Sequence, residues 1–147
     1  MNKTPIYIVV AVLAIFLMIG LYFYLKLSLD QIKEKNIAGI VEFREYVMML
    51  LEKTLNDPKS GMSVENNKIW KVVFLNNKNN MSNANKKAAD VINALTNKDL
   101  IYEAVTAVVN ELRTVIIIPL VSNLSDKKII IDDFNKKADD LLKKLKF

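Results

Sequence analysis

The sequence lacks cysteine and histidine, and it has only three glycines, three prolines and two arginines in 147 residues. Without thiols or imidazoles, the usual zinc ligands and the Ser-His-Asp or Cys-His catalytic groups are excluded. The glycines, Gly20, Gly39 and Gly61, stand too far apart for a dinucleotide-binding turn or a Walker A loop. We therefore expect a protein that is not an enzyme and that holds no metal and no cofactor.

Charge is also missing from one long stretch near the N-terminus. Residues 5–25, PIYIVVAVLAIFLMIGLYFYL, carry no charged side chain, whereas the whole chain has a net charge of +5. As a helix these 21 residues span about 31 Å, which matches a bilayer hydrocarbon core of about 30 Å. A cleaved signal peptide has a shorter apolar run of about 7–15 residues. The sequence thus predicts a permanent single-pass transmembrane helix over 5–25, after a short tail at 1–4.

Both ends of this segment have features typical of a membrane span. A proline suits the first turn of a helix, and tyrosines near the two ends suit the two membrane interfaces. The membrane-spanning residues that we single out are Pro5, Tyr7, Ala11, Ala14, Gly20, Tyr22, Tyr24 and Leu25. Lysines both precede and follow the segment, so the positive-inside rule leaves the side of the C-terminal part open. The expected location is a membrane, with a virion membrane as one setting.

Helical spacing of apolar residues continues beyond the apolar segment, now among charged residues. It predicts residues 26–57 as a helical stalk or as the first helix of a bundle, and both interpretations stay open. A run of turn formers, Asn56–Gly61, ends this helix. Its apolar stripe must pack on its own domain, on another copy or on a different protein. We name four of its residues as a candidate protein interface: Ile32, Ile40, Phe43 and Val47.

Residues 58–147 are expected to form a helical domain, which makes the fold class all-α: an N-terminal transmembrane helix, a helical stalk and a small helical bundle. Ser63 is predicted to cap a helix from Val64. Residues 69–75 suit a helix or a strand, with helix favoured, and residues 76–80 are predicted to form a loop. Further helices are expected over 83–96, over 98–118 and from Asp132 or Asp133 to Leu145, with 129–131 as a second weak strand candidate.

The helix expected at 98–118 is apolar, but we interpret it as a core helix and not as a second membrane span. Crossing a membrane would bury several polar and charged residues of this stretch: Asp99, Glu103, Asn110, Glu111 and Arg113. Each Asp or Arg at the centre of a span costs about 2.5–3.5 kcal/mol on insertion scales. The sequence therefore predicts one span.

Basic residues concentrate in residues 59–90, around Trp70 and Phe74. The candidate basic patch consists of Lys68, Lys71, Lys78, Lys86 and Lys87. Aromatic side chains between lysines would suit stacking on nucleic acid, but arginine, which binds phosphate with two hydrogen bonds, is absent there. We expect no nucleic-acid partner, and the patch suits anionic lipid headgroups or an acidic protein.

Together these features predict a non-enzymatic, membrane-anchored structural protein. Its helical domain would dock onto protein partners in a larger assembly, for example as a minor component linking the membrane and shell of a virion, or as an accessory subunit of a membrane complex. The expected partners are the lipid bilayer, other proteins of the assembly and further copies of the chain. The alternative is a holin-like or pore-forming protein that assembles through the small residues Ala11, Ala14 and Gly20.

Overall fold

The computed structural model describes residues 3–146, and all regular elements in this range are helices, which confirms the all-α prediction. They are α1 (Thr4–Leu55), α2 (Val64–Ala94), α3 (Lys98–Leu112), a π-helical turn (Arg113–Ile117), α4 (Ile118–Val121) and α5 (Lys128–Leu145). Contacts divide the chain after Ile32 into two units. The first holds the N-terminal part of α1, and the second is a helical bundle that begins at Lys33.

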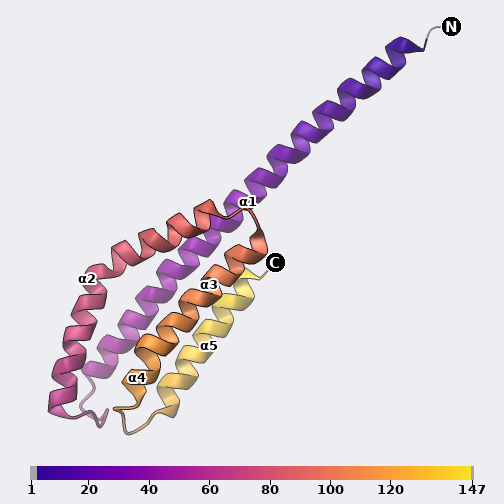
Figure 1. The fold of residues 1–147 in the computed structure, drawn as a ribbon. Coiled ribbons are helices and arrows are strands. Elements are labelled where there is room, and N and C mark those ends of the chain that lie inside the picture. The colour runs from indigo at the N-terminus through magenta and orange to yellow at the C-terminus, as the bar shows by residue number, and fades with distance from the viewer. Residues whose placement is uncertain (1–2, 147) are drawn as a thin grey trace. The chain divides into compact units, whose positions relative to one another are not determined.

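In the bundle, residues 33–55 of α1 run lengthwise beside α2, the α3–α4 segment and α5 (Figure 1). Of the two interpretations of residues 26–57, the structure therefore assigns 33–55 to the bundle as its first helix. This helix contributes a large share of the core, so the bundle begins N-terminal to residue 58.

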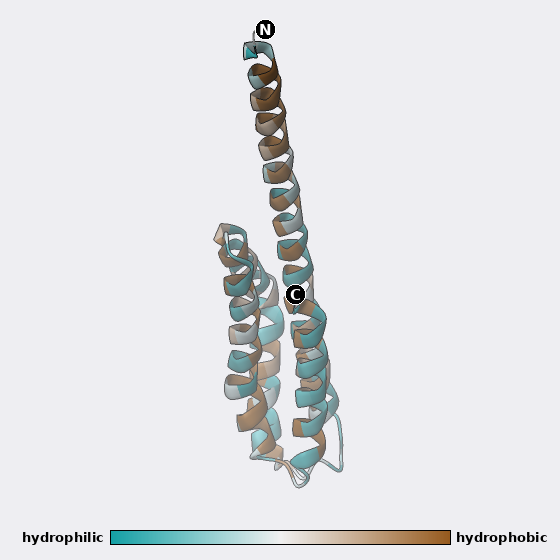
Figure 2. Cartoon of the chain, turned by 90° about the vertical axis from the view of Figure 1, so that its right-hand side faces the viewer, coloured by the Kyte–Doolittle hydropathy of each residue, from teal (hydrophilic) through white to brown (hydrophobic). Residues whose placement is uncertain are grey.

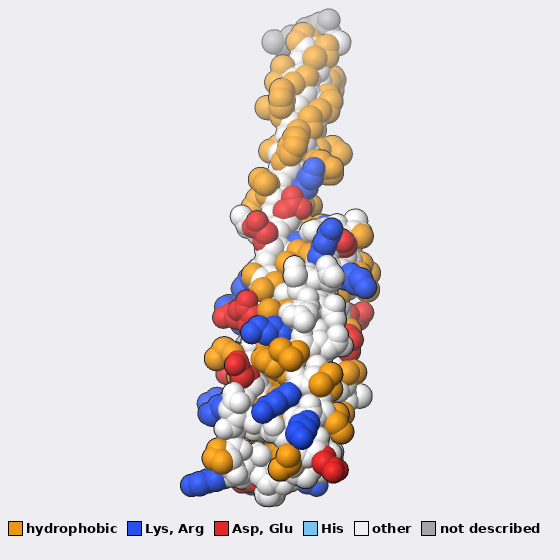
Figure 3. Space-filling model, turned by 90° about the vertical axis from the view of Figure 1, so that its left-hand side faces the viewer, with side chains coloured by type: hydrophobic (Ala, Val, Ile, Leu, Met, Phe, Trp, Pro, Cys, Tyr) orange, Lys and Arg blue, Asp and Glu red, His pale blue; other side chains and the backbone are white. Residues whose placement is uncertain are grey.

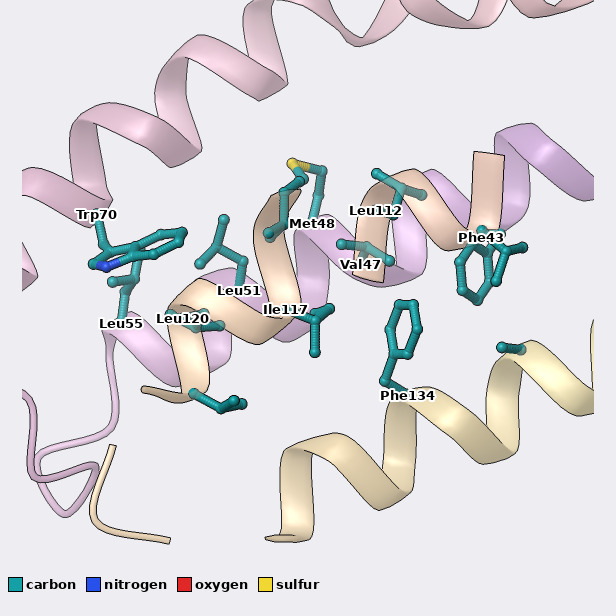
Figure 4. Packing of buried hydrophobic residues seen from close by; sticks show 14 of the residues in the cluster. Phe43, Val47, Met48, Leu51, Leu55, Trp70, Leu112, Ile117, Leu120 and Phe134 are labelled. Carbon is teal, nitrogen blue, oxygen red and sulfur yellow. The ribbon is translucent and has the colours of Figure 1, made fainter. Parts of the chain in front are cut away.

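The core of the bundle is a single cluster of apolar side chains from all of its helices. The rings of Phe43 on α1 and Phe134 on α5 meet edge to face, with centroids 5.4 Å apart (Figure 4). Trp70 on α2 closes the other end of the cluster beside Leu55. Fully burying each such large side chain contributes about 1.5–3 kcal/mol. Further members are Val47, Met48, Leu51, Val109, Leu112, Ile116, Ile117, Leu120, Val121, Leu124 and Ala138.

The turn between α1 and α2 follows the local signals of the sequence. The Asp57 carboxylate accepts a hydrogen bond from the Lys59 backbone N–H at 2.9 Å, and Gly61 has a φ of 77°, where glycine is favoured. The backbone N–H of Ser125 donates to the Ser60 carbonyl at 3.0 Å, which ties this turn to the loop before α5. Ser63 caps α2 by accepting from the Asn66 backbone N–H, so the predicted start at Val64 is confirmed.

Helix α2 is longer than the sequence pattern indicates. Residues 69–75 are helical, as favoured, but the loop predicted at 76–80 and the break before 83 are wrong. Asparagine side chains in this stretch hydrogen-bond within the helix: Asn77 Nδ2 donates to the Val73 carbonyl and Asn80 Nδ2 to the Asn76 carbonyl, both at 2.9 Å. These bonds let a polar segment of loop-like composition stay helical.

The helical run that begins at Lys98 passes through Pro119, although we expected it to end near Ile118. Proline lacks an N–H and its ring crowds the carbonyl four residues earlier. A π-helical turn precedes it, in which the Ile118 N–H donates to the Arg113 carbonyl five residues back. This wider turn makes room for the ring. The last helix begins at Lys128, earlier than Asp132 or Asp133, so residues 129–131 are helical and not extended.

Candidate functional site

The uncharged segment of α1 is exposed along its whole length within its unit. Every residue from Pro5 to Leu25 is exposed, including Phe16 at 67% and Leu17 at 74%. All eight residues singled out as membrane-spanning lie on it, and a Cβ added at Gly20 would meet nothing within 4 Å. Figure 2 shows this part of the helix as mostly hydrophobic. The segment is long and apolar enough to cross a membrane.

A second helical run, Lys98–Val121, is also long and apolar enough to cross a membrane by length and composition alone. Its apolar side, however, lies in the bundle: Ile101 and Val105 have no exposed surface, and Ile117 is 1% exposed. Packing in the bundle buries part of its apolar surface, while Val115 and Ile118 remain 61% and 52% exposed. This agrees with its interpretation as a core helix.

The candidate protein interface on α1 is corrected by the structure. Ile40 and Phe43 are each 2% exposed and Val47 is fully buried, so none of them offers an exposed surface to another protein. The stripe packs on its own domain, which was one of the three options open for it. Ile32, the last residue of the first unit, is half-buried.

The candidate basic patch lies along α2 and separates into two parts. At 3.6 residues per turn, Lys68, Lys71, Lys78 and Lys86 fall within an arc of about 80° but extend along about 27 Å of helix. They form a row and not a compact patch, and Lys78 Nζ lies 5.8 Å from the centroid of the Phe74 ring. Lys87 instead lines a cavity on another side of α2. Trp70, the aromatic residue at the centre of the predicted patch, is 9% exposed and belongs to the core.

Three large aliphatic side chains on the outer side of α2 were not singled out from the sequence. Ile69, Val72 and Leu75 are 60%, 67% and 54% exposed, beside Lys68 and Lys71. Figure 3 views the molecule from the α2 side, where hydrophobic and basic side chains lie next to one another over the bundle. The sequence could have predicted their exposure, because in a helix over 69–75 only Trp70, Val73 and Phe74 face inward. We call Ile69, Val72 and Leu75 the α2 aliphatic surface.

A cavity of about 580 Å³ opens between α1, α2 and α3. Arg44, from α1, is its most buried charged side chain, and within residues 3–146 its buried Nε meets no hydrogen-bond acceptor. Burial lowers the pKa of the Arg44 guanidinium from its usual value, and the negative charge of Glu111 offsets part of that effect. The sequence did not indicate this cavity, because it depends on the course of α2.

Between residues 3 and 146, no three acidic side chains come close enough together to hold a metal ion. The comparisons with known proteins find no matching family, no matching curated protein and no matching solved structure.

Proposed function

We propose that this chain is a non-enzymatic, single-pass membrane protein whose helical bundle docks onto another protein of a larger assembly. Settings of this kind include a virion in which a minor component links the membrane to the shell, and a membrane complex with an accessory subunit. The observation that carries the proposal is the contrast between a 21-residue uncharged, exposed segment and a bundle with its own core. The first needs a hydrocarbon environment, and the second does not.

The anchor is supported by the amount of apolar surface on the segment. Side chains of the size of Leu and Phe each gain about 1.5–3 kcal/mol when they leave water, and nearly every residue of 5–25 is of this kind. A helix satisfies its own backbone hydrogen bonds, which the interior of a bilayer requires. A lipid bilayer is therefore the partner that fits this segment.

The docking surface is supported by the α2 aliphatic surface. Single exposed aliphatic residues are ordinary on proteins, but Ile69, Val72 and Leu75 follow one another on the outer side of a helix within two turns. Lysines on the same side, Lys68 and Lys71, add positive charge at its edge. An apolar centre with a polar rim is the usual composition of a protein interface. The complementary partner has an apolar groove bordered by acidic residues.

The non-enzymatic part of the proposal rests on the residue inventory. The sequence has no imidazole and no thiol, and its three glycines cannot form a phosphate-binding loop. A docking role requires only the apolar segment and the α2 aliphatic surface.

The docking role is tested by photo-crosslinking the full chain in the membranes where it resides. A photoreactive amino acid replaces Val72 in one variant and Ile129, which is 60% exposed on α5, in a matched control. We expect a discrete protein adduct from position 72 and none from 129. Reversing charge with Lys68→Glu and Lys71→Glu should lower the yield, since the partner is expected to be acidic.

Adducts with lipid alone at position 72 would contradict protein docking and would favour contact with headgroups. Equal yields at positions 72 and 129, or a yield that does not respond to charge reversal, would also count against the proposed surface.

A further inference from the structure

The cavity between α1, α2 and α3 changes from polar to apolar along the bundle. On α1 and α3, which run in the same direction, apolar residues come first: Ile40 precedes Arg44, and Ala104 precedes Glu111 (Figure 1). On α2, which runs in the opposite direction, the order is reversed, and Asn83 precedes Ile92. Arg44, Glu111 and the asparagines therefore lie toward one end of the cavity, and Ile40, Ile92 and Ala104 toward the other, with Lys87 of α2 between them, next to Ala88.

The charged lining residues carry a small excess of positive charge. Arg44 and Lys87 are cationic and Glu111 is anionic, so the formal balance is one positive charge. An anion with one negative charge balances this excess. A doubly charged phosphate fits less well, because Glu111 faces the same space.

The apolar end is lined by alanines and by larger aliphatic side chains. Ala88 from α2 and Ala104 from α3 face it, with Ile40 and Ile92 beside them. An α-helix about 10 Å across fills about 420 Å³ per turn, so about 580 Å³ would hold little more than one turn of a partner helix. From Asn80 to Ile92 the lining extends about 18 Å along α2, at about 1.5 Å per residue. This shape suits a slim, unbranched chain.

We propose that the bundle binds a single-chain fatty acid, with its carboxylate on Arg44 and Lys87 and its acyl chain between Ala88 and Ala104. This inference goes beyond the proposed docking role and uses a different side of α2. Arg44 donates to the carboxylate as a charged group, an interaction roughly twice as strong as a neutral hydrogen bond. The acyl chain displaces water from an apolar space.

The test uses the full chain in lipid nanodiscs and an octanoic acid that carries a diazirine near the end of its chain. After illumination, mass spectrometry locates the adducts. We expect adducts within residues 84–108, in addition to those in 5–25 from probe dissolved in the bilayer. Adducts in 5–25 report the lipid contact of that segment separately, so the membrane proposal and the fatty-acid proposal fail independently.

Matched variants separate the headgroup from the chain. Arg44→Met should lower the bundle adducts about tenfold, since hydrogen bonds to a charged group are of that strength. Ala88→Phe should remove them by filling the apolar end. Lys87→Met should lower them more than Lys86→Met, because Lys86 belongs to the row outside the cavity. The fluorescence of Trp70, the single tryptophan, confirms that each variant is folded.

Two further probes carry the same chain with an alcohol or a phosphate headgroup, and we expect weaker labelling of the bundle by both. Bundle adducts that are as strong with the alcohol as with the acid would overturn the proposal. Stronger labelling by the phosphate would overturn the choice of a carboxylate. Adducts confined to 5–25, or bundle adducts that survive both Arg44→Met and Ala88→Phe, would overturn the site itself.

Discussion

The two parts of α1 show that apolar content and burial are different properties. Residues 5–25 contain no charge, and all of them are exposed. Residues 33–55 of the same helix contain eight charged residues, yet Ile40, Phe43, Val47 and Leu51 are buried to 2% exposure or less. In the second part, apolar residues return every three or four positions and form one stripe. In the first part they cover all sides, so no packing against a single neighbour can bury them.

The difference also determines which environment each part requires. When a helix has an apolar stripe on one side and charges on the other, three other helices can bury the stripe while the charges stay in water. A helix that is apolar on every side requires surroundings that are apolar on every side. The following substitutions test whether the two parts respond separately, and they are arranged from the largest expected effect to the smallest.

Placing two lysines at the middle of the apolar segment should have the largest effect. Leu13→Lys together with Leu17→Lys should raise the free energy of insertion by about 5–7 kcal/mol, at about 2.5–3.5 kcal/mol for each lysine. We expect the double variant to leave the membrane pellet after a carbonate wash. Its bundle should unfold at the same temperature as the wild-type bundle, followed by Trp70 fluorescence.

Leu13→Met with Leu17→Met is the matched control and should stay in the pellet, because the side chains keep their size without charge. A double-lysine variant that also stays in the pellet would contradict the membrane assignment of residues 5–25.

One phenylalanine in each part of α1 allows a direct comparison of the same substitution. Phe43→Ala should lower the free energy of unfolding of the bundle by about 3–5 kcal/mol, because it leaves a cavity and removes the contact with Phe134. Phe16→Ala, at a position that is 67% exposed, should leave it unchanged. Thermal unfolding followed by Trp70 fluorescence measures both. Equal effects of the two substitutions would mean that the parts are not separate units.

The fold class could be predicted from sequence because its signals are local or periodic. Asp57 and Pro58 end α1, Ser63 begins α2, and the spacing of Phe134, Ala138 and Leu145 marks α5. The predicted ends of helices were wrong where one local preference overrode another. Asparagine is typical of loops, but the side chains of Asn77 and Asn80 hydrogen-bond to carbonyls of their own helix. Pro119 is accommodated by a π-helical turn that no sequence pattern indicates.

The candidate sites were harder to predict, for a different physical reason. The stripe with Ile40 and Phe43 has the same periodicity whether its partner is another protein or a later helix of the same chain. Only the course of the chain shows that the partner is internal. The cavity beside Arg44 likewise depends on where three helices diverge. The α2 aliphatic surface, in contrast, could have been derived from the helical positions of Ile69, Val72 and Leu75 alone.

Substitutions of two glycines test the same comparison with a smaller expected change in stability. A Cβ at Gly39 would lie 3.0 Å from a methyl carbon of Leu141 and 3.0 Å from one of Leu145, so α5 packs closely here. Gly39→Leu should destabilise the bundle by about 1–3 kcal/mol through overpacking. Gly20→Leu, where nothing lies within 4 Å, should leave the stability of the bundle unchanged. Urea unfolding of both variants in detergent measures the difference. A stable Gly39→Leu variant would mean that α5 does not pack on α1 at this residue.

The smallest expected effect concerns pH and Tyr46, a half-buried residue in the second part of α1. Its ring lies 6.0 Å from the Phe43 ring and 5.4 Å from Lys137 Nζ. Burial raises the pKa of the Tyr46 hydroxyl above its ordinary value, and the negative charge of Asp133 raises it further. The folded state therefore disfavours the ionised tyrosine. Its contribution to stability is fully present below the ordinary pKa of about 10 and is lost as the pH rises through the pKa of the folded state.

Tyr46→Phe keeps the ring and its contact with the Lys137 cation but cannot ionise. We expect its free energy of unfolding to fall less than that of the wild type between about pH 8 and about pH 11, a range that brackets the ordinary tyrosine pKa. All other titratable groups are the same in both proteins, so the difference between the two curves isolates Tyr46. Tyr24→Phe, in the first unit, is the matched control and should follow the wild type. If the curves of the Tyr46→Phe variant and the wild type stay parallel throughout this range, the hydroxyl of Tyr46 is not coupled to folding.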